Sequence, residues 1–72
     1  MTPQTSIKVI LNGHAHELPG GISVDDLLGT LGMQPELVAV EINRDLVRKR
    51  DFGSRRLVEG DQIEVVEFVG GG

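Results

Sequence analysis

The chain has 72 residues, the size of a single small domain, and 39% of them are apolar, which supports a modest core but no deep active-site cleft. It contains no cysteine, so disulfides and cysteine-based metal sites are excluded. Its formal net charge is −4, and its only aromatic residues are two phenylalanines. The chain therefore has few basic side chains to neutralise phosphates and few aromatic rings to stack on bases, and we expect no nucleic-acid partner.

The first part of the chain predicts a β-hairpin. Residues 7–11 carry apolar side chains at alternate positions, which is typical of a strand with one buried face. Asn12-Gly13 follows, and this pair favours a two-residue type I′ turn because both of its positions need a positive φ. Residues 14–18 are then the returning strand, which Pro19-Gly20-Gly21 ends.

A short helix is predicted next. Ser23 is a good N-cap, and Asp25 and Asp26 in the first turn face the positive end of the helix dipole. Gly32 and Pro35 end the helix after about two to three turns, so its stability depends on packing against a sheet. The apolar stripe that would face the sheet is Val24, Leu27, Leu28 and Leu31.

The second half of the chain predicts three more strands. Residues 38–42 alternate as a strand does, residues 43–45 form a turn, and residues 46–47 are a short edge strand. Residues 59–61 are another turn before the last strand, residues 62–69. We therefore expect one α+β domain over the whole chain, in which a mixed sheet of four to five strands packs on one main helix.

The last predicted strand has apolar side chains on both of its faces. Ile63 and Val65 share one face, whereas Val66 and Phe68 share the other. Two interpretations are open. Either Val66 and Phe68 lie on a face that the helix does not cover and form a docking patch, or a bulge or a loop returns them to the core.

No constellation of catalytic or metal-binding residues is evident. His14 and His16 share one face of a strand, but a metal site needs a third ligand and Glu17 points the other way, so a solvent-facing pair is the simpler interpretation. The serines and histidines have no nucleophile–base spacing, and no phosphate-binding loop is present. We expect no metal, no bound cofactor and no catalytic residue.

Two short basic islands, residues 48–50 and 55–56, interrupt the acidic chain. They are too short for a nucleic-acid surface, and we expect a solvated loop whose arginines form weak ion pairs with Asp51 or Glu59.

The expected location is the cytoplasm. No apolar run approaches the roughly 18 residues that span a membrane. Residues 1–6 are polar and lack the features of a signal peptide. The absence of cysteine fits a reducing compartment. We expect no membrane partner.

The last three residues, Gly70, Gly71 and Gly72, follow the last strand and end in a carboxylate. They are either a frayed chain end or a thin arm, about 10 Å long, that enters a narrow channel where any Cβ would clash. Adenylation by another enzyme makes a carboxylate a good electrophile, and a sulfur nucleophile then converts it to a thiocarboxylate. Because no other constellation supports chemistry, we favour the functional arm.

Four stretches of the chain resemble the ThiS family, the small sulfur carrier proteins of thiamine biosynthesis. They are residues 7–13 (IKVILNG), 23–31 (SVDDLLGTL), 38–47 (VAVEINRDLV) and 59–72 (EGDQIEVVEFVGGG), and they cover most of the chain in the order of the family. The last stretch is the most specific, because it runs from EGDQIEVV to a terminal Gly-Gly.

The resemblance implies the ubiquitin-like β-grasp fold and the role of a protein substrate rather than an enzyme. An E1-like adenylyltransferase would use ATP to activate Gly72, a cysteine desulfurase would provide the sulfur, and thiazole synthase would accept it. On the matching positions, Gly72 carries the sulfur, Gly70 and Gly71 thread the channels of the partners, and Val66 and Phe68 form the docking surface.

The chain departs from the family pattern at Arg48-Lys49, where members often have Pro-Arg, and at Phe52, where a larger aromatic residue is common. The small subunit of molybdopterin synthase shares the fold and the Gly-Gly end, but it approaches the tail through prolines that residues 66–69 lack. The alternatives that stay open are a carrier of that kind and a ubiquitin-like binding module with an inert tail.

Overall fold

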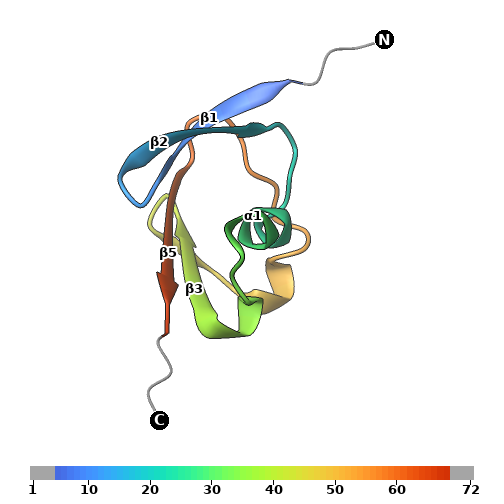
Figure 1. Ribbon diagram of the computed structural model, residues 1–72, viewed down its shortest axis with the longest axis vertical. Helices are drawn as coiled ribbons and strands as arrows, with labels where there is room; N and C mark the ends of the chain where they lie inside the picture. The colour runs from blue at the N-terminus through green and yellow to red at the C-terminus, as the bar shows by residue number, and fades with distance from the viewer. Residues whose placement is uncertain (1–4, 69–72) are drawn as a thin grey trace.

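The computed structural model describes residues 5–68, which form one mixed sheet with a helix against one of its faces (Figure 1). The strand order is β2-β1-β5-β3-β4; β1 and β5 run parallel, and the other neighbouring strands run antiparallel. The predicted α+β class with one main helix is confirmed, and the sheet has five strands. The elements in chain order are β1 (Ser6–Leu11), β2 (His14–Pro19), α1 (Val24–Leu31), the 3-10 turn η1 (Pro35–Leu37), β3 (Val38–Ile42), β4 (Asp45–Val47), the 3-10 turn η2 (Lys49–Asp51) and β5 (Gln62–Glu67).

Several predicted boundaries differ from the structure. β1 begins one residue earlier than expected, at Ser6, and β2 includes Pro19, which was expected to end it. Asp45, which was expected in a turn, is the first residue of β4. The positive φ angles of Asn43 (53°) and Arg44 (73°) close the hairpin in only two residues, which leaves Asp45 free to pair. The last strand ends at Glu67, and residue 69, where the prediction placed its end, lies outside the described residues.

The core fills the layer between the sheet and α1. Each of the three long inner strands contributes its alternate residues, as the period of two requires. Phe52 and Leu57, from the segment between β4 and β5, are also buried there. The segment between β4 and β5, which was expected to be a solvated loop, therefore also contributes side chains to the core. The buried apolar side chains are Ile7, Val9, Leu11, Val24, Leu27, Leu28, Val38, Val40, Ile42, Phe52, Leu57, Ile63 and Val65.

Helix α1 begins and ends as its sequence predicts. Ser23 and Asp26 form a capping box, in which the Ser23 hydroxyl accepts the Asp26 N–H (3.1 Å) and Asp26 Oδ2 accepts the Ser23 N–H (3.0 Å). The hydrogen bond from the Ser23 N–H to the Asp26 carboxylate, with the Ser23 side chain beside it, holds the pKa of Asp26 below its ordinary value. Gly32 ends the helix with a φ of 72°. Leu31, expected in the apolar stripe, is exposed because it lies in the last turn.

No helix between residues 5 and 68 is long and apolar enough to cross a membrane.

Candidate functional site

The predicted reactive arm, Gly70, Gly71 and Gly72, lies outside the described residues. The site is therefore defined by the part of the molecule from which the arm departs, the end of β5 and Phe68 after it. In Figure 1, β5 runs past the turn between β1 and β2 and ends at one extremity of the sheet, away from that hairpin.

The pairing register of β5 decides where its apolar residues point. β5 pairs with β3 without interruption, from Ile42↔Ile63 to Val38↔Glu67. An uninterrupted register leaves no bulge between these positions, so Val65 is in the core and Val66 is on the opposite face. The bulge interpretation is wrong and the uncovered-face interpretation is confirmed, whereas a docking role for this face stays a prediction.

Large apolar side chains around the end of β5 are exposed on this outer face, which is opposite to the one that α1 covers (Figure 1). Ile10 of β1 is exposed on the same face, but it lies beside Gln62 at the beginning of β5. The Phe68 N–H donates to the Leu37 carbonyl (2.7 Å), and Leu46 lies opposite Glu41 in the pairing of β3 with β4. The group therefore belongs to neighbouring segments around β3, β4 and β5. We call the group the outer patch; its members and their exposed fractions are Leu37 (43%), Leu46 (67%), Val66 (56%) and Phe68 (54%).

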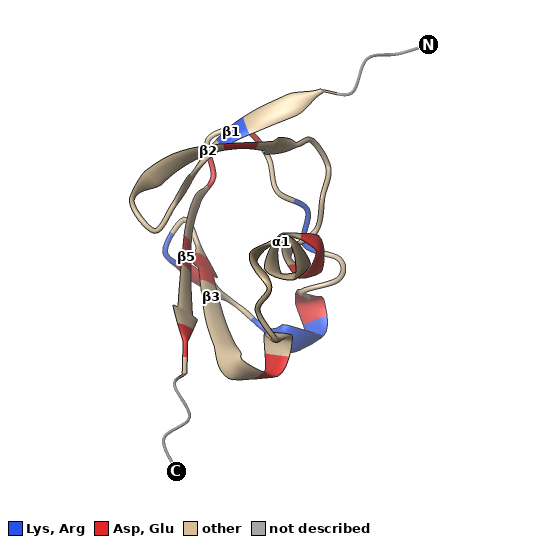
Figure 2. Cartoon of the chain, viewed as in Figure 1, with Lys and Arg blue, Asp and Glu red and all other residues tan. Residues whose placement is uncertain are grey.

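A groove with a basic side runs beside the outer patch. Ala39, Leu46 and Phe68 line it with apolar surface, and Lys49 and Arg50 line it with positive charge. Figure 2 shows these basic residues at η2, below α1 in the view. A partner surface with an apolar centre and an acidic rim would complement this arrangement.

Lys49 is a structural part of this groove rather than a free surface cation. Its Nζ donates to the Val38 carbonyl (2.8 Å) and lies 5.9 Å from the centroid of the Phe52 ring. Val38 lies beyond the part of β3 that pairs with β4, so the lysine takes the place of a strand partner there. Lys49 and the buried Phe52 therefore support the edge of β3.

Asn12 supports β5 on the side that faces β1. Its backbone N–H donates to the Ile63 carbonyl (2.8 Å), which is the last backbone bond between the β1 side and β5. Its side chain then continues the pairing: Asn12 Oδ1 accepts the Val65 N–H (2.9 Å) and Nδ2 donates to the Val65 carbonyl (3.3 Å). One amide side chain thus fixes β5 immediately before the outer patch.

The beginning of β5 is held by a buried carboxylate. Asp61 is 2% exposed; its carboxylate accepts Asn43 Nδ2 (3.0 Å) and the Val58 N–H (2.9 Å) and lies 3.6 Å from an Arg55 nitrogen. The Gln62 N–H donates to Asn43 Oδ1 (3.0 Å). This network joins the turn between β3 and β4 to the segment before β5.

The predicted ion pairs of the basic islands have the wrong partners. Arg55 pairs with Asp61 rather than with Asp51 or Glu59. The carboxylate of Glu59 instead accepts the backbone N–H of Lys8 (2.9 Å), because the turn before β5 lies beside β1.

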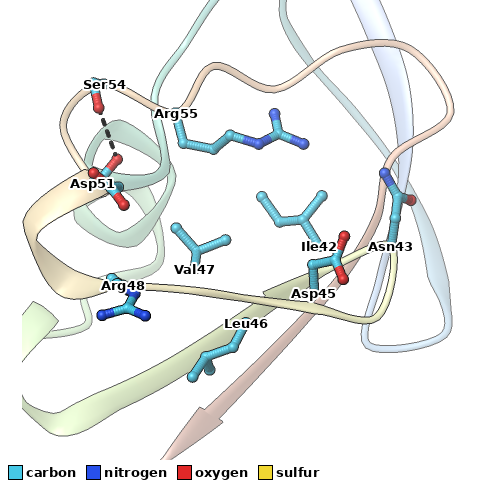
Figure 3. Close-up of a pocket in the computed structure, with 9 residues that line it drawn as sticks. All are labelled: Ile42, Asn43, Asp45, Leu46, Val47, Arg48, Asp51, Ser54 and Arg55. Carbon is cyan, nitrogen blue, oxygen red and sulfur yellow. Dashed lines mark hydrogen bonds between the residues drawn. The ribbon is translucent and has the colours of Figure 1, made fainter.

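A second hollow lies between β4 and the segment 51–55 (Figure 3). In Figure 3, Val47 and Arg55 point into it, whereas Leu46 points to the opposite side of the strand, toward the outer patch. The Ser54 hydroxyl donates to the Asp51 carbonyl (3.3 Å), and no histidine lines the hollow, so a nucleophile and its base are not brought together there.

The two histidines are exposed on β2, as predicted. His14 lies opposite Leu11 and His16 opposite Val9, so both are on the same side of the strand. Within residues 5–68, no group of three or more histidine, cysteine, aspartate or glutamate side chains is arranged to hold a metal ion.

Several residues of the site were not identified from the sequence. Leu37 and Leu46 complete the outer patch, and Asn12, Lys49 and Asp61 fix the strands around it. For Leu46, the sequence indicated only a place in a short edge strand, which is a weak sign of an exposed apolar side chain. The roles of the three polar residues depend on contacts with distant segments, which no local pattern reveals.

Comparison with known proteins places these features in a family. The model of the ThiS family matches residues 9–72 of the chain. The chain is 36% identical over 50 residues to the sulfur carrier protein ThiS of Bacillus subtilis, covering 69% of this chain and 76% of that protein. The crystal structure of the thiamine biosynthesis protein ThiS from Geobacter metallireducens superposes with a TM-score of 0.78 at 29% identity, over 92% of this chain and 100% of that one.

A longer protein also contains a similar sequence. The chain is 47% identical over 66 residues, 92% of its length, to a thiazole synthase of Magnetococcus marinus. The match covers 20% of that protein, so the chain spans about a fifth of the length of this relative.

Proposed function

The chain belongs to the ThiS family, and from this premise we propose that it is a sulfur carrier protein of thiamine biosynthesis, a protein substrate rather than a catalyst. The observation that carries the proposal is the extent of the family match, which includes β5, the outer patch and the three terminal glycines. Within residues 5–68, no group of three or more histidine, cysteine, aspartate or glutamate side chains could hold a metal ion that would point to a metal-dependent function instead.

We assign the reacting group to the carboxylate of Gly72. In an E1-like adenylyltransferase, this carboxylate attacks the α-phosphate of ATP, and pyrophosphate leaves to give an acyl adenylate. A sulfide equivalent, produced by a cysteine desulfurase and its reductant, then attacks the acyl carbon, and AMP leaves to give the thiocarboxylate. The partner binds and consumes the ATP, so the carrier needs no cofactor of its own.

The terminal glycines suit this role for a steric reason. Gly70 and Gly71 lack a Cβ, so the chain can pass through a channel that is only as wide as the backbone and can adopt the φ and ψ angles that the channel imposes. The recognition surface must then lie on the folded domain, and the outer patch at the end of β5 is the exposed apolar surface nearest to the arm in sequence.

Thiazole synthase is the proposed acceptor of the sulfur. The support is the thiazole synthase of Magnetococcus marinus, which contains a region 47% identical to this chain in the same polypeptide. Two functions joined in one chain in a relative are expected to meet as separate proteins elsewhere. An acidic carrier with a basic groove beside its outer patch would dock by apolar contact and charge complementarity.

Intact-mass spectrometry tests the proposal. Incubation with the adenylyltransferase of the same organism, ATP and a sulfide source should shift the mass by the replacement of one oxygen with sulfur. Deletion of Gly72, or Gly71→Val, should abolish the shift without changing the unfolding midpoint. An unchanged mass of the wild-type chain, under conditions in which Bacillus subtilis ThiS is modified by its own enzyme, would overturn the proposal.

A further inference from the structure

The two sides of β5 differ in how far along the strand they are paired. In the antiparallel pair with β3, the Gln62 carbonyl accepts the Asn43 N–H, and the Phe68 N–H donates to the Leu37 carbonyl. The even-numbered residues of β5 therefore direct their backbone N–H and C=O groups toward β3. The odd-numbered residues therefore direct theirs toward β1, as the bond from the Asn12 N–H to the Ile63 carbonyl shows.

Strand β1 is too short to pair with all of these odd-numbered residues. Its register with β5 contains only Ile10↔Gln62 and Leu11↔Ile63. The Asn12 side chain satisfies both backbone groups of Val65, and there the internal pairing on this side stops.

Glu67 is the next residue with its backbone groups on this side. None of the residues from Thr5 to Phe68 donates to its carbonyl or accepts from its N–H. The open edge, which we define as the β1 side of β5 at Glu67, differs from the outer edges of the sheet at β2 and β4. It lies on a strand whose other side is fully paired, and it borders the exposed Val66 and Phe68.

We propose that the open edge accepts an extended backbone segment of the adenylating partner, which adds to the sheet beside Glu67 in the place that β1 would occupy if it continued. The inference rests on the proposed sulfur-carrier function. Asn12 is the positioning residue that determines where the internal pairing ends and the open edge begins.

Strand addition fits the observed groups better than side-chain docking alone. An N–H and a carbonyl on the same edge are bonded together by one residue of an extended chain, and this is the mode by which sheet edges capture partner strands. An apolar side chain on the same segment would pack against Val66 on the outer face. The partner segment is therefore extended, with apolar residues at alternate positions.

A proline substitution at Glu67 tests the proposal. In Glu67→Pro the N–H of the open edge is lost, but the bonds from β5 to β3 are kept, because prolines are tolerated in strands where the N–H faces outward. Glu67→Ala is the matched control, since it removes the same side chain and keeps the N–H. We expect similar unfolding midpoints for the two variants, and a kcat/KM for adenylation that is about tenfold lower in Glu67→Pro than in Glu67→Ala.

Amide hydrogen exchange on the wild-type chain gives an independent readout that needs no variant. With the adenylating enzyme and without ATP, the Glu67 amide should exchange more slowly than in the free carrier, whereas the Phe68 amide is already bonded to Leu37 and should change less. Equal adenylation of the two variants, or an unprotected Glu67 amide in the complex, would overturn strand addition. A wild-type chain that is never modified would instead contradict the sulfur-carrier function.

Discussion

The beginning and the end of β5 are built in different ways. At its beginning, Gln62 and Ile63 have strand neighbours on both sides, and the buried Asp61 network joins the segment before β5 to the turn between β3 and β4. At its end, β3 is the only strand neighbour of Val66 and Glu67 among residues 5–68, and large apolar side chains face outward. One strand of six residues thus has an anchored half and a presenting half.

The difference separates stability from recognition. Burial and satisfied hydrogen bonds in the anchored half stabilise the fold, whereas the exposed apolar surface of the presenting half contributes little to folding and is available to a partner. Asn12 lies at the boundary, because it bonds to Ile63 through its backbone and to Val65 through its side chain. The predictions below test this separation, from the largest expected effect on stability to the smallest.

The largest contrast is expected between two truncations on the same strand. Ile63→Ala removes a side chain that is 1% exposed and should lower the free energy of unfolding by about 2–5 kcal/mol. Val66→Ala should change it by less than about 1 kcal/mol, because Val66 is more than half exposed. Urea unfolding measures both. Equal losses from the two variants would contradict the division of β5 into two halves.

The next effect comes from the buried carboxylate. Asp61→Ala leaves the Val58 N–H and the Asn43 amide without their acceptor, and we expect a loss of about 1–3 kcal/mol. Asp45→Ala, an exposed aspartate on β4, is the control and should be nearly neutral. A neutral Asp61→Ala would show that the network does not anchor β5.

A smaller loss is expected at the boundary residue. Asn12 has a φ of 49°, so Asn12→Gly keeps the conformation of the turn while it removes the amide that bonds Val65. We expect a loss of about 1 kcal/mol and faster exchange of the Val65 amide. If Val65 remains as protected as in the wild-type chain, Asn12 does not define the end of the internal pairing.

The smallest effect is the acid dependence of the helix cap, remote from both halves of β5. The folded state lowers the pKa of Asp26, so Asp26 contributes stability above its unfolded pKa that is lost as the pH falls through the folded value. The unfolding midpoint should therefore decrease as the pH falls below about 4, the ordinary pKa of an aspartate, and Asp26→Asn should reduce this decrease. A variant with an unchanged acid profile would show that the capping box does not produce it.

Much of the fold could be predicted from the sequence because its signals are local. Alternation in residues 7–11 and 38–42, Asn12-Gly13 at a turn, and Ser23 before an apolar stripe each specify an element without reference to the rest of the chain. Asp45 was misplaced because Asn43 and Arg44 close its hairpin with positive φ. Asparagine favours that conformation, but arginine does not, so the pair lacks the signal that Asn12-Gly13 carries.

The site could be predicted only in part. The adjacent apolar residues Val65 and Val66 indicated that both faces of the strand carry apolar side chains. They did not show whether a bulge returns Val66 to the core, because that depends on the register with β3. The sequence indicated only a turn for Asp61 and a solvated basic loop for Lys49, because their hydrogen bonds are formed with residues that only the fold brings close. Local patterns therefore locate the surface, and tertiary contacts determine what holds it in place.

The central claim is that the outer patch serves recognition and not folding. Its most direct test is the rate of thiocarboxylate formation, followed by intact mass, in the double variant Val66→Ser, Phe68→Ser. The control is Ile10→Ser, an exposed apolar residue of β1 outside the patch. We predict that the double variant unfolds within about 1 kcal/mol of the wild-type chain and reacts at least about tenfold more slowly, with the control unaffected. A folded double variant that reacts at the wild-type rate would contradict the account.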